Sequence, residues 1–196
     1  VIVVSIIAGF GTVQIAANGV ANSLDSMGCI VGQAMNLAMI TVIGRCVGAG
    51  DSGQVRHYTK KLLKITYVCT FVVNSVILLC LPWILKCYGL STETTQLSYI
   101  LVMIHNGMAM FLWPASFVLP NMLRACNDVR FTMVLSIFSM FMFRIGFSYI
   151  IGVNMGYGAI GVWIAMVLDW IFRVICFVSR YLSGHWLKTA ELKDNR

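Results

Sequence analysis

The stretch ITYVCTFVVNSVILLCLPWIL (residues 65–85) contains no charged residue and follows three lysines, at Lys60, Lys61 and Lys64. A helix needs about 20 apolar residues to cross the hydrocarbon core of a bilayer. This stretch therefore predicts a membrane-spanning helix over about residues 58–85. Other stretches of the chain have the same character, and a shorter one at the start has the length of half a helix. The spans that we expect are residues 1–9 (partial), 13–47, 58–85, 95–124, 131–153 and 159–182.

The composition is that of a membrane protein. Hydrophobic residues make up 59% of the chain and charged residues 11%, whereas soluble domains carry about 25% charged residues. Inside a bilayer every backbone polar group must be satisfied within the protein, so a helical bundle is the fold that this pattern allows. We expect an all-α integral membrane protein, in which residues 1–186 form a six-helix transmembrane lobe and residues 187–196 form a tail.

The basic residues indicate how the chain is oriented. Cytoplasmic loops carry an excess of Lys and Arg, and most basic residues of this chain fall on one face if the predicted helices cross in turn. The tail is then cytoplasmic, and the protein is a multi-pass protein of the plasma membrane. The net charge of +7 is expected to face anionic lipid headgroups rather than nucleic acid. The residues on this face are Arg45, Arg56, Lys60, Lys61, Lys64, Arg124, Arg130, Arg180, Lys188, Lys193 and Arg196.

Two local features concern the helix ends. The first third of the predicted helix 13–47 is polar, with Gln14, Asn18, Asn22 and Asp25, and we expect this end to project into the outside water. After that helix, residues 51–57 are expected to form a loop, in which Asp51 or Ser52 caps the next helix.

Three ionisable residues are expected near the middle of the membrane. Arg144 lies ~18 Å from one end of its helix and Asp169 ~15 Å from the opposite end of the next, at 1.5 Å per residue. Arg173 is one helical turn from Asp169 on the same face. A carboxylate between two guanidiniums offsets the cost of burying each charge. Arg144, Asp169 and Arg173 are therefore predicted to form a cluster, which is either a structural clamp, the favoured interpretation, or a charge that works in transport.

Other polar or kinked positions are candidates for a cavity or a hinge. Gln33 and Asn36 either line a polar path or hydrogen-bond between helices, and His105 and Asn106 are either packing residues or part of a proton relay. Trp113 precedes Pro114, which removes a backbone hydrogen bond and should kink its helix. Pro120 lies about two turns further on, so this helix is expected to be the most deformable one in the chain.

Several motifs together resemble one transporter family. The sequence GRCVGAGD (residues 44–51) and the sequence PNMLRACND (residues 120–128) look like two cytoplasmic turns of the multidrug and toxic-compound extrusion (MATE) transporters. The sequences GVW (161–163), DWIFR (169–173) and RY (180–181) are similar to the last span of that family, and RI (144–145) to the span before it. The order and spacing of these motifs extend over almost all of residues 10–186.

This resemblance implies a fold and an activity. MATE transporters have two six-helix lobes around a central cleft and export drugs, toxic organic cations or metabolites by alternating access, driven by Na⁺ or H⁺. The chain would be the C-terminal lobe, helices seven to twelve with the first truncated, and its partner the N-terminal lobe of the same polypeptide. Sodium-coupled relatives place an acid on the tenth helix, where this chain has Phe111, Leu112, Trp113 and Pro114. The coupling ion is thus expected to bind in the other lobe.

Other functions are weighed against an antiporter. A lipid-linked saccharide flippase of the same superfamily would favour a strongly cationic cavity, for which Arg144 and Arg173 are available. A dimerising half-transporter or pore is another alternative, since carriers built from repeats can exist as halves. A membrane enzyme is disfavoured, because His57, His105 and His185 are widely spaced without acidic partners in the sequence. No catalytic residue, metal ligand or bound cofactor is expected, and the other partners are the lipid bilayer and a small-molecule substrate.

Overall fold

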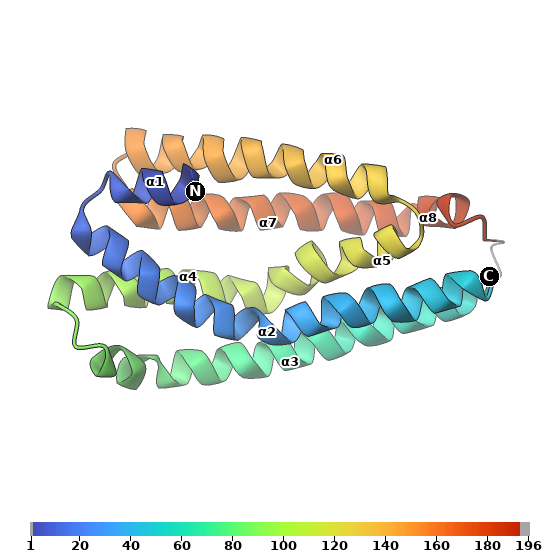
Figure 1. Ribbon diagram of the computed structural model, residues 1–196, viewed down its shortest axis with the longest axis horizontal. Helices are drawn as coiled ribbons and strands as arrows, with labels where there is room; N and C mark the ends of the chain where they lie inside the picture. Colours follow the sequence, from blue (N-terminus) through green and yellow to red (C-terminus); the bar gives the residue numbers. More distant parts are fainter. Residues whose placement is uncertain (1, 193–196) are drawn as a thin grey trace.

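The chain forms a bundle of long helices whose axes lie roughly along one common direction (Figure 1). The computed structural model describes residues 2–192, and within this range it contains helices and turns but no strand. The helices are α1 (Ile2–Ala8), α2 (Thr12–Gly48), α3 (Ser52–Cys87), α4 (Thr92–Trp113), α5 (Leu119–Ala125), α6 (Val129–Ser139), α7 (Gly158–Leu182) and α8 (His185–Thr189), together with two π-helical segments, η1 (Pro114–Val118) and η2 (Met140–Asn154).

Five spans among the described residues are long and apolar enough to cross a membrane. They are α2, α3, the continuous helix Thr92–Ala125, the continuous helix Val129–Asn154, and α7. Their outer surfaces carry large exposed apolar side chains, as expected where a surface faces lipid instead of water. The structure thus confirms the predicted all-α membrane fold. Examples of these exposed side chains are Leu37, Leu79, Trp83, Phe111, Val134 and Ile175.

The third helix begins earlier than predicted. We expected residues 51–57 to form a loop, but α3 begins at Ser52. The Asp51 side chain accepts a hydrogen bond from the Gln54 backbone N–H at 2.9 Å and so caps the first turn. Because the cap lies at the start of the expected loop, every residue after it can be helical. At about 1.5 Å per residue, α2 and α3 are both longer than the hydrocarbon core is thick, so their basic ends can extend beyond it.

The polar first third of α2 does not simply project into water, which corrects the second local expectation. Gln14 Oε1 accepts a hydrogen bond from the Ala159 backbone N–H at 3.0 Å. Asn18 is buried, and its Oδ1 accepts a hydrogen bond from Trp163 Nε1 at 3.0 Å. Gln14 and Asn18 thus connect α2 to the start of α7. An apolar side chain at either position would leave a hydrogen-bond donor of α7 unpaired.

The helix that contains Pro114 is bent, as predicted. Pro114 lacks a backbone N–H, and the π-helical segment η1 begins at this residue. The Leu119 N–H donates to the Pro114 carbonyl, five residues earlier, so the regular pattern of α4 is interrupted before α5 begins. Figure 1 shows α4 and α5 at a clear angle to each other. A hinge function for this bend stays a prediction.

η2 and α7 are in direct backbone contact. A Cβ added to Gly161 of α7 would lie 2.8 Å from the backbone N of Gly152 and 2.8 Å from the backbone carbonyl carbon of Ile151, both in η2. No side chain can fit at position 161, so the two backbones pack directly on each other. This contact holds η2 and α7 in a fixed relative position.

The core consists of two apolar clusters, one toward each end of the bundle. The cluster at the α1 end contains Leu24, Leu81, Leu101, Val102, Val162 and Trp163, among other residues. The cluster at the α8 end contains Met39, Ile43, Ala109, Trp113, Trp170 and Phe177, among others. Between them the same helices carry buried polar and ionisable side chains, described below as the polar layer.

Candidate functional site

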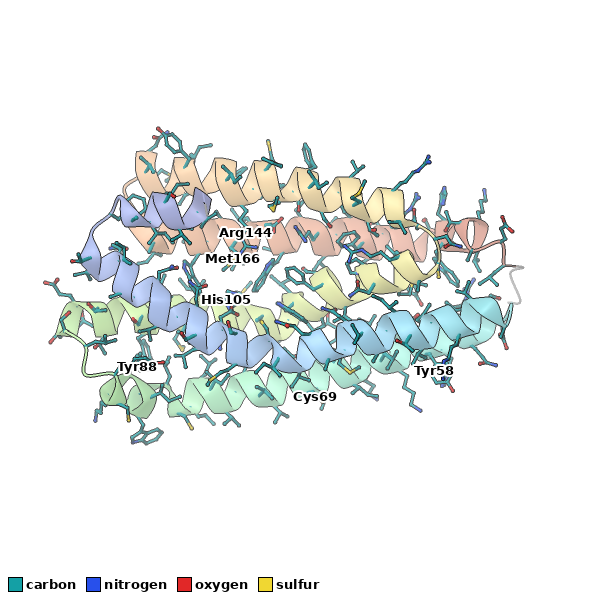
Figure 2. All side chains as sticks on the ribbon, viewed as in Figure 1. Tyr58, Cys69, Tyr88, His105, Arg144 and Met166 are labelled. Atoms are coloured by element: carbon teal, nitrogen blue, oxygen red, sulfur yellow. The ribbon has the colours of Figure 1, made fainter. Side chains whose placement is uncertain are left out.

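The polar layer lies between the two apolar clusters and receives side chains from α2, α3, α4, η2 and α7. Figure 2 labels Arg144, Met166 and His105 in the middle part of the bundle. Ionisable residues inside a membrane bundle are costly and mark functional sites by default. The polar layer is therefore the candidate site. Its members are Asp25, Asn74, His105, Asn106, Arg144 and Asp169.

The first part of the layer is an ion pair on α7 that is closed on most sides. Arg173 Nε lies 3.1 Å from Asp169 Oδ1, and Asp169 is completely buried. The same guanidinium donates to Ser139 Oγ at 2.8 Å and, through Nη2, to the Ser136 carbonyl at 3.2 Å. It also lies over the Phe117 ring, 5.4 Å from its centroid. Arg173 is thus held by α6, α7 and η1 together, in the geometry of a clamp.

Arg144 lies near this pair but makes a different contact. The sequence suggested a carboxylate between two guanidiniums, whereas the Arg144 Nη2 donates to Met166 Sδ at 3.2 Å. Met166 lies almost one turn before Asp169 on α7. The Arg144 guanidinium reaches the level of Met166, so the sulfur atom is its acceptor. Asp169 Oδ2 has no hydrogen-bond partner among the described residues. The structure brings Asp169 and Arg173 into contact and leaves Arg144 beside them, and the role of the cluster stays a prediction.

The second part of the layer is a contact between an acid and a histidine that was not predicted from the sequence. His105 Nδ1 lies 2.9 Å from Asp25 Oδ1, which joins α4 to α2. The expectation that Asp25 stands at an exposed helix end is wrong, since only 25% of its side chain is exposed and that of His105 is 2% exposed. The sequence did contain an indication of this contact. Asp25 and His105 lie the same number of residues after the first residues of their helices, Thr12 and Thr92, so the two side chains share one depth.

Four further residues surround this pair. The Cys29 thiol donates to Asp25 Oδ1 at 3.3 Å, and His105 Nδ1 also lies 3.3 Å from Asn106 Oδ1. The imidazole makes edge-to-face contacts with two indole rings, Trp163 at 5.1 Å and Trp170 at 4.7 Å between centroids. Asn106 Nδ2 is buried and has no hydrogen-bond partner among the described residues.

The remaining sequence candidates lie elsewhere. Gln33 is exposed on α2. Asn36 Oδ1 accepts a hydrogen bond from Asn121 Nδ2 at 2.8 Å, so this residue joins α2 to α5, one of its two predicted roles. Trp113 is buried against Gly32, whose missing side chain makes room for the indole ring, and it stacks on Phe117. Trp113 and Pro114 thus lie at the bend of the continuous helix Thr92–Ala125, which is the fourth span when the short α1 is counted as the first.

A cavity of about 470 Å³ adjoins the polar layer on the side of α1 and η2. Arg144 is the charged residue in its lining, and Asn18 and Asn22 contribute amides. Trp163 lines the cavity and also contacts His105. The cavity is large enough for a small organic molecule. The remaining lining residues are Val3, Val4, Ile7, Met140, Phe141, Ile145, Val162 and Met166.

A third ion pair lies at the end of the bundle, outside the polar layer. Arg180 binds Asp128 with two hydrogen bonds, Nε to Oδ2 at 2.7 Å and Nη2 to Oδ1 at 3.1 Å. This pair attaches the end of α7 to the turn that precedes α6. In the same turn, burial raises the pKa of the Cys126 thiol to about 12, with the Asp128 carboxylate adding to the rise. The thiol stays protonated at neutral pH, and the turn is structural in character.

The fold and the polar layer define a polytopic α-helical membrane protein with ionisable residues inside its bundle. The family model described as MatE matches residues 1–150. This match covers most of the chain, which therefore belongs to the MatE family of transporters.

Two curated proteins show what the chain is similar to. It is 22% identical over 186 residues to the probable multidrug resistance protein NorM of Thermotoga maritima, an alignment that covers 95% of the chain and 40% of the relative. It is 30% identical over 71 residues to the uncharacterized transporter YisQ of Bacillus subtilis, which covers 36% of the chain and 16% of that protein. The chain therefore spans less than half the length of each of these relatives.

Proposed function

We propose that this chain works as part of a secondary active transporter that exports drugs, toxic organic cations or metabolites by alternating access, driven by H⁺ or Na⁺. The observation that carries the proposal is the polar layer, which lies across the middle of the bundle between two apolar clusters. Ionisable side chains inside a membrane bundle cost free energy and mark functional sites by default, and the Asp25–His105 contact is not part of the Asp169–Arg173 clamp. The similarity to the NorM protein points in the same direction.

The architecture that we propose follows from the family. The chain is the C-terminal lobe, and its partner is the N-terminal lobe of the same polypeptide, in the plasma membrane with the C-terminus in the cytoplasm. The positions of the basic residues support this orientation. The turns α2–α3 and α5–α6 and the helix α8 all lie at one end of the bundle (Figure 1), and most of the basic residues lie at or near this end.

The efflux function is favoured over the flippase by the contacts of the two half-buried arginines, Arg144 and Arg173. A lipid-linked saccharide carries phosphate groups, and a site for it needs several free cations. Arg173 is neutralised by Asp169, which leaves Arg144 as the charged residue in the lining of the cavity. An apolar cavity with two amides, two thioethers and an indole suits an organic molecule of low charge.

The test is transport by the full-length polypeptide that contains this chain, purified and reconstituted in liposomes. Ethidium, a fluorescent organic cation, serves as the probe, and either a pH gradient or a Na⁺ gradient is imposed. Ethidium movement that needs the protein and stops when the gradient is dissipated supports the proposal. Ethidium and other organic cations that move at the same rate in protein-free liposomes under both gradients would contradict it.

The lobe assignment has its own test. An antibody against residues 188–196 should detect a band of about twice the mass of this chain in native membranes, since repeat-built carriers of this kind have two halves. A band at the mass of this chain alone would instead put the dimerising half-transporter first.

A further inference from the structure

We propose that the Asp25–His105 pair is the site at which this transporter binds the proton that drives it. This inference rests on the transport function proposed above and names its coupling ion and the residues that bind it. It also replaces the expectation that the coupling ion binds only in the other lobe.

The donors around Asp25 fit a proton and not a metal cation. His105 Nδ1 lies between two acceptors, Asp25 Oδ1 at 2.9 Å and Asn106 Oδ1 at 3.3 Å, so this nitrogen carries a hydrogen. The Cys29 thiol donates to the same carboxylate oxygen. Hard cations require several oxygen ligands with free lone pairs, whereas here hydrogens point at the carboxylate. Among the described residues, no group of three or more His, Cys, Asp or Glu side chains is arranged to hold a metal ion.

The other imidazole nitrogen, His105 Nε2, is where the proton binds. When Nε2 is protonated, the imidazolium and the Asp25 carboxylate form an ion pair with no net charge. When it is not protonated, the pair keeps one negative charge. Histidine is the side chain whose charge changes in the physiological pH range.

The other charged and titratable groups near the pair set its electrostatic surroundings. On α2 the neighbour is Cys29, and on α7 Asp169 is neutralised by Arg173. On η2 Arg144 interacts electrostatically with both Asp25 and Asp169. The neighbours from α3 and α4 are the uncharged amides of Asn74 and Asn106, both close to Gly28 of α2. Arg144 therefore stabilises the Asp25 carboxylate after the proton leaves, and no other free charge competes with it among the described residues.

The pair is linked to the cavity through one side chain. Trp163 contacts His105 on one side, lines the cavity on the other, and donates from Nε1 to Asn18 Oδ1. An organic cation in the cavity is attracted by the negative charge of the unprotonated pair, and this attraction is lost once the imidazolium forms and the pair carries no net charge. The proton and a cationic substrate then exclude each other, which is the requirement for exchange transport.

The pair also connects α2 to the helix that leads into the bend at Pro114. Asp25 belongs to α2 and His105 to α4, and α4 is followed at Pro114 by the π-helical segment η1. The protonated pair holds α4 against α2 by an ion pair. Loss of the proton leaves a weaker neutral-donor hydrogen bond, which allows α4 to change its angle at the bend.

The first experiment measures protonation without any substrate. A protonated imidazole quenches the fluorescence of an indole that it contacts, so the tryptophan fluorescence of the full-length protein should fall as the pH is lowered. The fall should be absent in His105→Gln and present in His57→Gln, a matched control at an exposed histidine. The fall should be smaller in Asp25→Asn, because the imidazolium loses its counter-charge. Full quenching in His105→Gln would overturn the proposal.

The second experiment measures transport in the liposome assay, in variants that elute as folded protein in gel filtration. Ethidium movement driven by a pH gradient should fall roughly 5- to 150-fold in His105→Gln, the range of typical coupling between two sites, while His57→Gln keeps the full rate. Unchanged pH-driven transport in His105→Gln, or transport by the unaltered protein under a Na⁺ gradient alone, would overturn the proton site and leave the transport function standing. Transport under neither gradient contradicts the function itself, while the fluorescence result still decides whether the pair binds a proton.

Discussion

The polar layer contains two acidic residues, and their surroundings differ. Asp169 is completely buried and binds Arg173 on its own helix, and Arg173 is fixed in turn by Ser136 and Ser139 of α6. Asp25 is one-quarter exposed and binds His105, a residue of another helix whose charge depends on pH. The first pair combines two permanent charges in a closed site, and the second combines one such charge with a titratable group.

The helices around the two pairs differ in the same way. About two turns before Asp169, α7 packs on η2 backbone to backbone at Gly161 and Gly152. About two and a half turns after His105, α4 leads into a π-helical segment that begins at Pro114. We therefore expect η2 and α7, which pack backbone to backbone, to move together, and the contact of α2 with α4, which leads into a proline bend, to be the more variable one. Ionisable residues in one layer can thus serve different purposes, depending on their partners.

The largest effect is expected from breaking the clamp. Asp169→Asn leaves the Arg173 guanidinium buried without a counter-charge, which costs about 3–5 kcal/mol. The yield of folded protein in gel filtration should drop strongly. Asp51→Asn is the matched control, because Asn caps a helix about as well as Asp, and its yield should stay normal. A normal yield of Asp169→Asn together with lost transport would show that Asp169 works in transport.

The next largest effect is expected at the rigid helix contact. In Gly161→Ala the new methyl group meets the backbone of η2, which cannot move away as a side chain could, and overpacking of this kind costs about 1–3 kcal/mol. The thermal unfolding temperature should fall. Gly107→Ala in α4 is the control, since no atom lies within 4 Å of an added Cβ there, and it should not lower this temperature. Equal temperatures for both variants would show that η2 and α7 are not rigidly packed.

A smaller effect is expected from the variable contact. The interaction free energy of Asp25 with His105 can be measured by a double-mutant cycle with Asp25→Asn and His105→Gln in chemical unfolding. We expect roughly 1 kcal/mol, within the range for residues in contact, and a larger value at acidic than at alkaline pH because the ion pair exists only when His105 is protonated. A value that does not change with pH would indicate a permanently neutral hydrogen bond.

The smallest effect on stability is expected at the bend. Pro114→Ala restores a backbone donor in a segment already adapted to its absence, so the free energy of unfolding should change by less than about 1 kcal/mol. Transport should nevertheless slow, because the fourth span becomes stiffer. Pro82→Ala, at an exposed proline inside α3, is the control and should leave the transport rate unchanged. Equal transport rates for the two variants would rule out a hinge at Pro114.

Part of the candidate site was predictable from the sequence. Asp169 and Arg173 lie on one helix, and their contact follows from helical spacing alone. The bend at Pro114 follows from the chemistry of proline. The contact of Asp25 with His105 joins two helices, and depth in the membrane restricts such contacts without deciding them, because a helix can rotate about its axis. The rotation of a helix about its axis also explains why Arg144 binds Met166 instead of Asp169.

The sequence by itself determined the fold class, the number of long spans and the family, because length, hydropathy and local motifs carry that information along the chain. The apolar stretches had to become helices, since a bilayer offers no partner for a free backbone group. Only the tertiary structure decided which polar side chains meet. Those contacts depend on the rotation and close approach of α2, α4 and α7, which small residues such as Gly28 and Gly161 permit, and many side chains far apart in the sequence set that packing together.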